Sequence, residues 1–393
     1  MTHRNAQSSD SADRAQPVLV LNAGSSSLKY QVVVPETGER QAGGTIERIG
    51  EQGSDVADHS AALEQMTDDL RSDGVDLHSA SLRAVGHRVV HGGPDFSEPV
   101  VIDDAVLDRV RELSALAPLH NPAAVIGIEA ARERFDVPHV AVFDTAFFSS
   151  LPPEASTYAV PRDLARRHSI RRYGFHGTSH QWVSHAAAEL VGRPIGELRQ
   201  VILHLGNGCS ASAVRGGVAV DTSMGLTPLQ GLVMGTRSGD VDPGLHAYLG
   251  REAGLSLDEV DTLLNKKSGV LGLSGVNDFR ELEQRLSGGD VEARLAFDVA
   301  VHRLKHYVGA YLAILGGIDV LVFTAGIGEN SIALRAAVTE GLEDLGIVID
   351  RARNGARSKQ ARVISPDGSR VVVAVVPTNE ELAIARQTAE LVG

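Results

Sequence analysis

The chain has 393 residues, of which 43% are hydrophobic and 22% are charged, as in an ordinary soluble globular protein with room for two or three domains. The net charge of −13 argues against binding to nucleic acid or to an anionic membrane. Cys209 is the single cysteine, so no internal disulfide is possible, and we expect a reducing, cytoplasmic location.

Two segments bear on targeting. Residues 1–16, MTHRNAQSSDSADRAQ, are polar and lack an apolar core, which argues against a secretory signal and predicts a disordered tail. The most apolar stretch, 310–327, is interrupted by Gly316, Gly317 and Asp319. It predicts a helix end that leads into a buried strand rather than a membrane span.

The first half of the chain begins with strands and continues with helix–strand alternation. Strands are predicted at 18–21, 28–34 and 82–90, helices at 103–116 and 122–135, and a strand at 137–143 that ends on Asp144. This order indicates an α/β domain.

The opening pattern then returns. Residues 201–214, VILHLGNGCSASAV, again form an apolar strand, a Gly/Asn turn and a second strand. A long helix at about 292–315, strands at 319–323 and 371–376, and a C-terminal helix follow. We interpret this as an internal duplication with one lobe at 17–150 plus the helix 380–393 and a second lobe at 151–379.

The serine turn GSSSLK at 24–29 differs from a Walker P-loop, since it lacks the second glycine and a following helix. Its backbone N–H groups, the hydroxyls of Ser25, Ser26 and Ser27, and the charge of Lys29 could converge on one phosphate. The alternative is an ordinary hairpin turn.

Two further glycine turns support phosphate binding. Gly206-Asn207-Gly208 allows close approach of a ligand to the backbone, so the turns of the two lobes could clamp a polyphosphate across a cleft. The third turn, 326–330, precedes a predicted helix and could hold the nucleoside end. By itself it is a weak partial match to a dinucleotide motif.

From Val18 onward the chain resembles the acetate kinases of the acetokinase family. The resemblance rests on nine motifs in family order: NAGSSSLK, GHRVVHGG, LHNP, FDTAFF, GFHGTSH, HLGNG, MGTRSGDVDPG, TAGIGEN and PTNEEL. It implies two duplicated actin-like (ribonuclease H-like) α/β lobes around a nucleotide cleft, and a cytoplasmic homodimer. It also implies reversible, direct in-line phosphoryl transfer from ATP to acetate, which gives ADP and acetyl phosphate with Mg²⁺ or Mn²⁺.

Acetate is ionised at neutral pH and needs no general base, so the chemical task is to hold two anions together and neutralise the transition state. The resemblance makes Asp144, His176 and Arg237 catalytic and Arg88 substrate-binding. A bidentate guanidinium suits a small carboxylate, although a lone arginine can also be a surface salt bridge. We hypothesise that Asp144 orients Arg88 or Mg²⁺.

His176 precedes a helix that the Thr178–Gln181 spacing predicts to begin at Ser179. This places the imidazole near a natural anion site. A zinc pair with His180 is the alternative, but no third ligand is evident nearby.

For Mg²⁺ the resemblance points to Asn22 and Glu380. The Thr378–Glu381 spacing predicts a capping box that would occupy Glu381 and leave Glu380 free to bind the ion. The alternative is that both acids simply favour a helix N-terminus.

The remaining site residues follow from the resemblance. Gln230 stands where glutamate is common in the family, and the segment near Asn277 is shorter than usual; Cys209 is expected to pack. An acyl pocket is implied at Val90, Leu119, Phe175 and Pro228. Nucleotide contacts are implied at Ser25, Ser27, Lys29, His204, Leu205, Gly206, Asn207, Gly208, Asp278, Phe279, Arg280, Gly326, Ile327, Gly328, Glu329 and Asn330.

Two other functions stay open. A propionate or broader short-chain acyl kinase differs from an acetate kinase by one or two methylenes, a distinction that sequence does not make. An actin- or chaperone-like ATPase would use nucleotide for motion, but it would have no need for Arg88, His176 and Arg237.

Overall fold

The computed structural model describes residues 16–393 except 25, 51–53, 76, 78–81 and 119, so nearly all of the predicted tail lies outside the described residues. The described chain divides into two compact units. The first runs to Ser149 and takes in the C-terminal segment Asn379–Gly393, and the second is Ser150–Thr378.

The described residues of the first unit form one six-stranded sheet, four α-helices, of which one is the last helix of the protein, and two short 3-10 helices. Its elements are β1 (Val18–Ala23), β2 (Ser27–Val34), β3 (Glu39–Glu47), α2 (His59–Ser72), β4 (Ala84–Val89), β5 (Val100–Val101), α3 (Asp104–Glu112), η1 (Leu113–Ala115), α4 (Asn121–Arg134), β6 (His139–Phe143), η2 (Ala146–Phe148) and α16 (Glu380–Val392).

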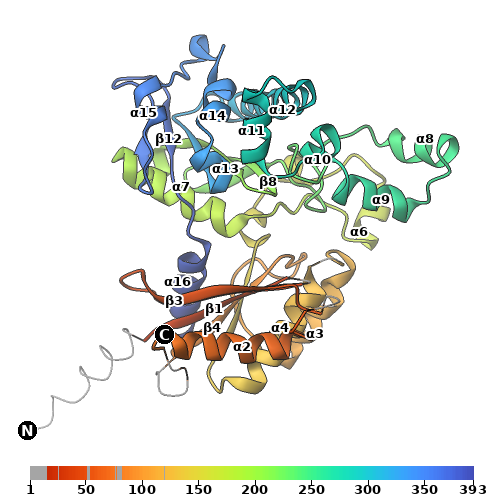
Figure 1. The fold of residues 1–393 in the computed structure, drawn as a ribbon, viewed down its shortest axis with the longest axis vertical. Helices are drawn as coiled ribbons and strands as arrows, with labels where there is room; N and C mark the ends of the chain where they lie inside the picture. Colours follow the sequence, from red (N-terminus) through yellow and green to blue (C-terminus); the bar gives the residue numbers. More distant parts are fainter. Residues whose placement is uncertain (1–15, 25, 51–53, 76, 78–81, 119) are drawn as a thin grey trace, which may run out of the picture. The chain divides into compact units, whose positions relative to one another are not determined.

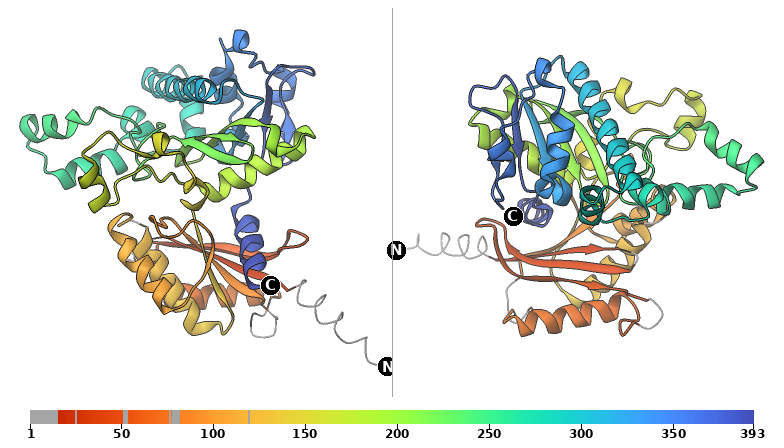
Figure 2. Two further views of the ribbon diagram at one scale, coloured as in Figure 1. Left: turned by 180° about the vertical axis from the view of Figure 1, so that it is seen from behind. Right: turned by 45° about the horizontal axis from the view of Figure 1, so that its top comes forward.

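The sheet order is β3-β2-β1-β4-β6-β5. β1, β2 and β3 form an antiparallel meander, whereas β1, β4 and β6 run parallel to one another. α4 contacts β1 and β4, α2 contacts β2 and β3, and α16 contacts β1, β2, β4 and β6 (Figures 1 and 2).

Side chains alternate between the two faces of the sheet along each strand. Val85 of β4 belongs to an apolar cluster with Leu63 and Met66 of α2, whereas the next residue, Gly86, faces Ile384 and Thr388 of α16. The sheet is therefore covered by α2 and α4 on one face and by α16 on the other. The C-terminal helix completes the core of the first unit.

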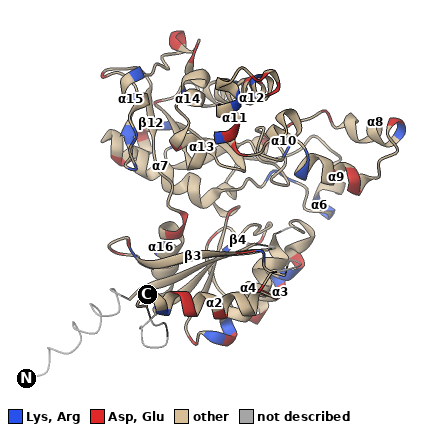
Figure 3. Ribbon diagram, in the orientation of Figure 1, with Lys and Arg blue, Asp and Glu red and all other residues tan. Residues whose placement is uncertain are grey.

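Charged side chains of this unit gather on α2, α3 and α4, as Figure 3 shows. Several form exposed ion pairs, including Arg109 with Asp95 and Arg111 with Glu129. Such exposed pairs contribute little to stability, typically about 0–1 kcal/mol.

The second unit also contains one six-stranded sheet. Its elements are α5 (Pro153–Ser156), α6 (Arg162–Arg167), α7 (Gly177–Val191), η3 (Ile195–Glu197), β7 (Arg199–Leu205), β8 (Cys209–Arg215), β9 (Val218–Thr222), α8 (Gly244–Glu252), α9 (Leu257–Lys266), α10 (Gly269–Ser274), α11 (Phe279–Ser287), α12 (Val291–Leu315), β10 (Val320–Thr324), α13 (Ala325–Asn330), α14 (Ile332–Thr339), η4 (Glu343–Leu345), α15 (Arg351–Gly355), β11 (Arg362–Val363) and β12 (Val372–Val375).

The two sheets have the same topology, which confirms the predicted duplication. The second order is β11-β12-β10-β7-β8-β9, with an antiparallel meander β7-β8-β9 and parallel neighbours β7, β10 and β12. Each meander carries a register shift between its second and third strands, at Val32/Val33 and at Ala213/Val214. The fold is thus an α/β structure built from one repeated unit.

Most predicted elements are found within a few residues of their expected bounds. The apolar stretch 310–327 is, as predicted, the end of α12, two glycines and the buried strand β10. The helix predicted at 103–116 is shorter, because α3 ends at Glu112 and the chain continues as the single 3-10 turn η1, which is common at helix ends.

Gly86 sets how closely α16 approaches the sheet. A Cβ at this position would lie 2.5 Å from Thr388 Oγ1 and 2.9 Å from Ile384 Cγ2. We predict that Gly86→Ala lowers the free energy of unfolding by about 1–3 kcal/mol, because overpacking displaces α16. Urea unfolding measures the change.

Gly309→Ala in α12 is the control, since no heavy atom lies within 4 Å of its Cβ position. It should leave the protein as stable as, or slightly more stable than, the parent. Equal stability of Gly86→Ala and Gly309→Ala would contradict the tight packing of α16.

Candidate functional site

Three predicted site residues lie at the carboxyl ends of neighbouring parallel strands. Asn22 is near the end of β1, Arg88 near the end of β4, and Asp144 directly follows β6. The strand registers pair Val20 with Gly86 and Arg88 with Val142. By alternation, all three residues lie on the α16 face of the sheet.

Arg88 and Asp144 form a bidentate pair. Arg88 Nε donates to Asp144 Oδ1 at 3.0 Å and Nη2 donates to Oδ2 at 2.5 Å. The Asp144 side chain is 1% exposed and that of Arg88 is 18% exposed. Burial alone would lower the pKa of Arg88, but the carboxylates of Asp144 and Glu380 outweigh it and raise the pKa, so the guanidinium stays charged.

Glu380 joins this group from the first turn of α16, with its Oε2 at 3.8 Å from Arg88 Nε. Burial raises the pKa of Glu380, and the neighbouring Asp144 and Glu381 raise it further, against the opposing charges of Arg88 and Lys29. A bound cation would relieve this carboxylate repulsion. The oxygen donors of Asn22 and Glu380 on one sheet face therefore fit a hard cation such as Mg²⁺.

The capping box predicted for α16 is wrong. Asn379 is the N-cap, and its side chain accepts a hydrogen bond from Leu382 N. The Thr378 hydroxyl contacts Ser179 Oγ instead, and Glu381 pairs with Lys29. An asparagine one residue later is the better cap, and the partner of Glu381 lies on a strand far away in sequence.

The serine turn between β1 and β2 is a tight hairpin in which Gly24 N donates to Ser27 O at 2.7 Å. Lys29, predicted to add positive charge for phosphate, lies on β2 and forms an ion pair with Glu381. Ser25 lies outside the described residues.

His176 lies directly before α7 in the second unit, in a left-handed conformation with φ of 59°. Such a φ is uncommon for a residue other than glycine and is frequent at functional sites. The predicted capping box of Thr178 and Gln181 is wrong, because α7 begins earlier, at Gly177, and has no side-chain cap. The Thr178 hydroxyl is buried without a hydrogen-bond partner among the described residues.

A chain of histidines and serines extends from His176 into the core. Ser210 Oγ lies 2.9 Å from His176 Nδ1 and 2.7 Å from His180 Nε2, and Ser212 Oγ lies 2.7 Å from His180 Nδ1. Burial holds the pKa of His180 well below its usual value. Because both ring nitrogens of His180 are hydrogen-bonded to serines, the network does not support the zinc alternative.

His204 lies beside this chain. Its ring stacks on His176 with centroids 4.3 Å apart, and its Nδ1 lies 2.8 Å from Ser179 Oγ. His204 thus contacts the His176 ring directly and is held from α7 through Ser179.

Arg237 and His176 flank the glycine turn between β7 and β8. A Cβ at Gly208 would lie 3.4 Å from both Arg237 Nη1 and His176 Nε2. Arg237 is otherwise held by Nη1, which donates to Pro228 O at 3.2 Å. Burial lowers the pKa of Arg237 from its usual value. A side chain at Gly208 would occupy the space between the turn, the guanidinium and the imidazole, which glycine leaves open.

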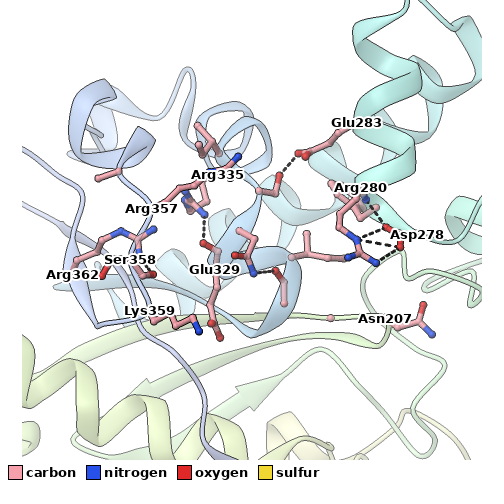
Figure 4. A pocket seen from close by; sticks show the side chains of 18 of the residues that line it. Asn207, Asp278, Arg280, Glu283, Glu329, Arg335, Arg357, Ser358, Lys359 and Arg362 are labelled. Carbon is pink, nitrogen blue, oxygen red and sulfur yellow. Dashed lines mark hydrogen bonds and ion pairs between the residues drawn. The ribbon is translucent and has the colours of Figure 1, made fainter. Parts of the chain in front are cut away.

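A cavity of about 1020 Å³ opens beside this turn within the second unit (Figure 4). Its walls come from the turn, the start of α11, α13 and the segment after α15. Nine of the residues predicted to contact nucleotide line it: Gly206, Asn207, Asp278, Phe279, Arg280, Gly326, Ile327, Glu329 and Asn330. Of these, Asp278 and Arg280 form an ion pair at 2.6 Å.

The prediction of a third glycine turn at 326–330 is wrong. Residues Ala325–Asn330 form the short helix α13, which begins directly after β10. Arg335 of α14, fully buried, donates from Nη1 to the carbonyl oxygens of Gly328 and Glu329 at 2.9 Å. The carbonyls at the end of α13 are thus capped from another helix, which the local sequence does not reveal.

The four acyl-pocket residues are divided between the units. Val90 follows β4 in the first unit, Phe175 and Pro228 belong to the second, and Leu119 lies outside the described residues. Gln230, the residue that departs from the family pattern, accepts a hydrogen bond from Tyr158 at 2.7 Å.

Cys209 is a packing residue, as expected. Its thiol is buried and contacts Gly206 O, and burial raises its pKa to about 12. It is therefore protonated at neutral pH and is a poor nucleophile.

Sequence reasoning missed Ser210, Ser212, Ser179 and Arg335. A signal was present for the first two, because serines at alternate positions of an otherwise apolar buried strand must lie on one face and require partners. His176 and His180, one helical turn apart, are those partners.

Among the described residues, no helix is long and apolar enough to cross a membrane. The same residues contain no group of three or more His, Cys, Asp or Glu side chains arranged to hold a metal ion.

These features define a class of protein. A duplicated α/β fold in which an arginine and a histidine flank a glycine turn is the arrangement expected of a phosphotransferase.

Comparisons with known proteins identify the family. The acetokinase family model matches residues 17–386. An acetate kinase of Streptomyces avermitilis is 55% identical over 394 residues, covering 96% of this chain and 97% of its own. The crystal structure of Porphyromonas gingivalis acetate kinase is 43% identical with a TM-score of 0.91, covering 96% of this chain and 100% of that one.

The crystal structure of a propionate kinase from Francisella tularensis is 40% identical with a TM-score of 0.89, covering 95% of this chain and 98% of that one. With the family model and the full-length relatives together, the chain belongs to the acetokinase family.

Ser210 bridges His176 and His180, so its hydroxyl should determine the hydrogen bonding of both imidazole rings. We predict that Ser210→Ala shifts the ring nitrogen resonances of His176 and His180 in NMR spectra and lowers the free energy of unfolding by about 1–3 kcal/mol, because buried polar groups lose a partner.

Ser212→Ala is the matched control, since the Ser212 hydroxyl contacts His180 and not His176. It should change the His180 signals and leave those of His176 in place. Unchanged His176 signals in Ser210→Ala would contradict the bridge.

Proposed function

We propose that this protein is an acetate kinase, which transfers the terminal phosphoryl group of ATP directly and in line to acetate, giving acetyl phosphate and ADP in a reversible reaction. The observation that carries the proposal is the likeness to acetate kinases along nearly the whole chain. The geometry of the two units then supports a role for each residue.

Arg88 binds the acetate carboxylate. A guanidinium has five N–H donors, and Asp144 accepts hydrogen bonds from two of them. Within the described residues no further hydrogen bond of Arg88 is found, so its remaining donors can bind a second carboxylate, while the buried pair fixes the orientation of the arginine. Asp144 is thus a positioning residue, and it need not accept a proton since acetate is already ionised.

Arg237 and His176 stabilise the phosphoryl group in transfer. Both flank Gly208, and Ser210 holds His176 by its Nδ1 so that Nε2 lies toward the turn. Fixed donors around the turn stabilise charge that spreads over the phosphoryl oxygens without reorganising during the reaction. The nucleoside end occupies the cavity beside Asp278 and Asn330.

Asn22 and Glu380 would hold Mg²⁺, or Mn²⁺ with the same oxygen ligands. When bound, the metal neutralises charge on the phosphate oxygens. We further propose a cytoplasmic homodimer, in keeping with the family resemblance; light scattering during size-exclusion chromatography would show twice the monomer mass.

A propionate kinase is the second candidate, supported by the likeness to the Francisella tularensis structure. One methylene in an apolar pocket changes the free energy by about 1–3 kcal/mol, so a related enzyme readily accepts both acids.

Acyl phosphate formation tests the function and the substrate together. With ATP and Mg²⁺, acetate, propionate and butyrate are supplied in turn and the product is trapped with hydroxylamine. We predict the strongest hydroxamate signal with acetate. The strongest signal with propionate would favour the second candidate, and ATP hydrolysis without hydroxamate would favour an ATPase.

The role of Asp144 is tested by Asp144→Asn. We predict a rise in the KM for acetate of at least tenfold, because the variant loses a charged acceptor that holds Arg88. Steady-state kinetics and Mg²⁺ titration measure the effect. Turnover lost with unchanged acetate and Mg²⁺ affinity would contradict the orienting role.

Asp95→Asn is the matched control. Asp95 also accepts two hydrogen bonds from one arginine, from Nε and Nη2 of Arg109, but both at Oδ2 and on an exposed surface of the same unit. Its loss should leave KM and kcat within about twofold of the parent, as expected for an exposed pair.

A further inference from the structure

The cavity of the second unit has a basic end that the proposed function does not use. Arg335, Arg357, Lys359 and Arg362 line it on one side of Glu329 (Figure 4). Within the described part of the chain none of these four cations forms an ion pair, whereas other arginines of this unit, such as Arg280 and Arg353, pair with a carboxylate.

Arg362 carries the clearest sign of a missing ligand. Its Nε is buried and has no hydrogen-bond partner within the described residues, whereas Nη1 donates to Ser358 O at 3.1 Å. Burial lowers the pKa of Arg362, and the charge of Glu329 opposes this shift. A buried guanidinium N–H without an acceptor costs free energy, which an anion at this place would recover.

Arg335 of α14 adds a second charge, which is fully buried. Its donors bind Asn354 Oδ1 and three carbonyl oxygens, so no carboxylate neutralises it directly. Burial and the like charge of Arg362 lower the pKa of Arg335 to about 10, which still leaves it charged at neutral pH. The protein therefore holds excess positive charge at this end of the cavity.

The carboxylates of the cavity are already engaged. Asp278 pairs with Arg280, Glu283 accepts a hydrogen bond from Ser331, and Glu329 accepts one from Thr378 N. Asn207, Asp278 and Arg280 lie at the opposite end of the cavity from Lys359 and Arg362 in Figure 4. A nucleotide held as proposed would leave the basic end free.

We propose that this basic end is a second anion subsite, which binds a phosphate group while nucleotide occupies the other end. The guanidinium groups of Arg362 and Arg357 and the ammonium of Lys359 are the donors, a set suited to a tetrahedral oxyanion. The position of the nucleotide rests on the proposed function, whereas the cluster of basic residues does not. The ligand is inorganic phosphate or the phosphate of a phosphorylated metabolite.

Calorimetric titration of the full-length protein with inorganic phosphate tests the subsite. Arg357→Gln/Lys359→Gln removes two exposed charges whose side chains form no hydrogen bond within the described residues, so folding should be unaffected. We expect the dissociation constant for phosphate at this subsite to rise by about tenfold or more, because each charge-assisted contact is stronger than a neutral one. Arg362→Gln should have the same effect.

Two controls locate the binding. Arg251→Gln/Lys266→Gln removes the same charges from exposed positions on α8 and α9 and should bind phosphate as the parent does. Arg237→Gln, which alters the phosphoryl site, should retain the component that Arg357→Gln/Lys359→Gln loses. The subsite would be overturned if phosphate binding were unchanged in Arg357→Gln/Lys359→Gln. It would also be overturned if Arg251→Gln/Lys266→Gln weakened phosphate binding equally.

Titration with ADP distinguishes the source of the phosphate. The subsite predicts unchanged ADP affinity in Arg357→Gln/Lys359→Gln and phosphate binding that persists with ADP bound. Equal weakening of ADP and phosphate would mean that the basic end holds the phosphates of the nucleotide itself, and would overturn a second subsite. The hydroxamate assay on the same samples reports the proposed function separately, so either proposal can fail alone.

Discussion

Asn22, Arg88 and Asp144 are far apart in sequence but come from the ends of three parallel strands, β1, β4 and β6. Successive side chains of a strand point to opposite faces, so a register slip of one residue in β4 would turn Arg88 away from Asp144. Apolar residues such as Val85 fix the register, because they must face α2 and α4. The packing of the core on one face thus determines the chemistry on the other.

That other face is completed by the last helix of the chain. α16 brings Glu380 to Arg88 and Glu381 to Lys29, and its close approach depends on Gly86. A buried Arg–Asp pair is weak support for stability, since desolvation of the two charges offsets much of their attraction. What the pair does determine is the orientation of the guanidinium, which two hydrogen bonds to Asp144 fix.

In the second unit, neutral groups rather than a carboxylate hold His176 in place. His176 is fixed through Ser210 and stacks on His204, while Arg237 reaches the same glycine turn. Uncharged hydroxyls hold the imidazole without adding negative charge beside it. The two repeated sheets therefore present different chemistry from the same topology.

The sequence predicted the duplication because a strand, a glycine turn and a second strand form a local pattern that occurs twice. It placed Arg88 and Asp144 at strand ends for the same reason. The prediction failed at the N-termini of α7 and α16, because neither predicted capping box forms. The residue before α7 is His176 in a left-handed conformation, and the N-cap of α16 is Asn379.

It also failed at α13, whose last carbonyls are capped by Arg335 from the next helix. These outcomes depend on contacts between separate elements, which spacing along the chain does not encode. The serine bridge at Ser210 was within reach, since two serines alternate in a strand that is otherwise apolar.

The central claim is that Asp144 acts through Arg88 rather than on the reactants. The most direct measurement is a double-mutant cycle on kcat/KM for acetate with Arg88→Ala, Asp144→Ala and the double variant. If the two residues act as one unit, the double variant should lose little more kcat/KM than Arg88→Ala alone, because Asp144 has no guanidinium to orient once Arg88 is removed. Losses that multiply in the double variant would contradict the account and assign Asp144 an independent role.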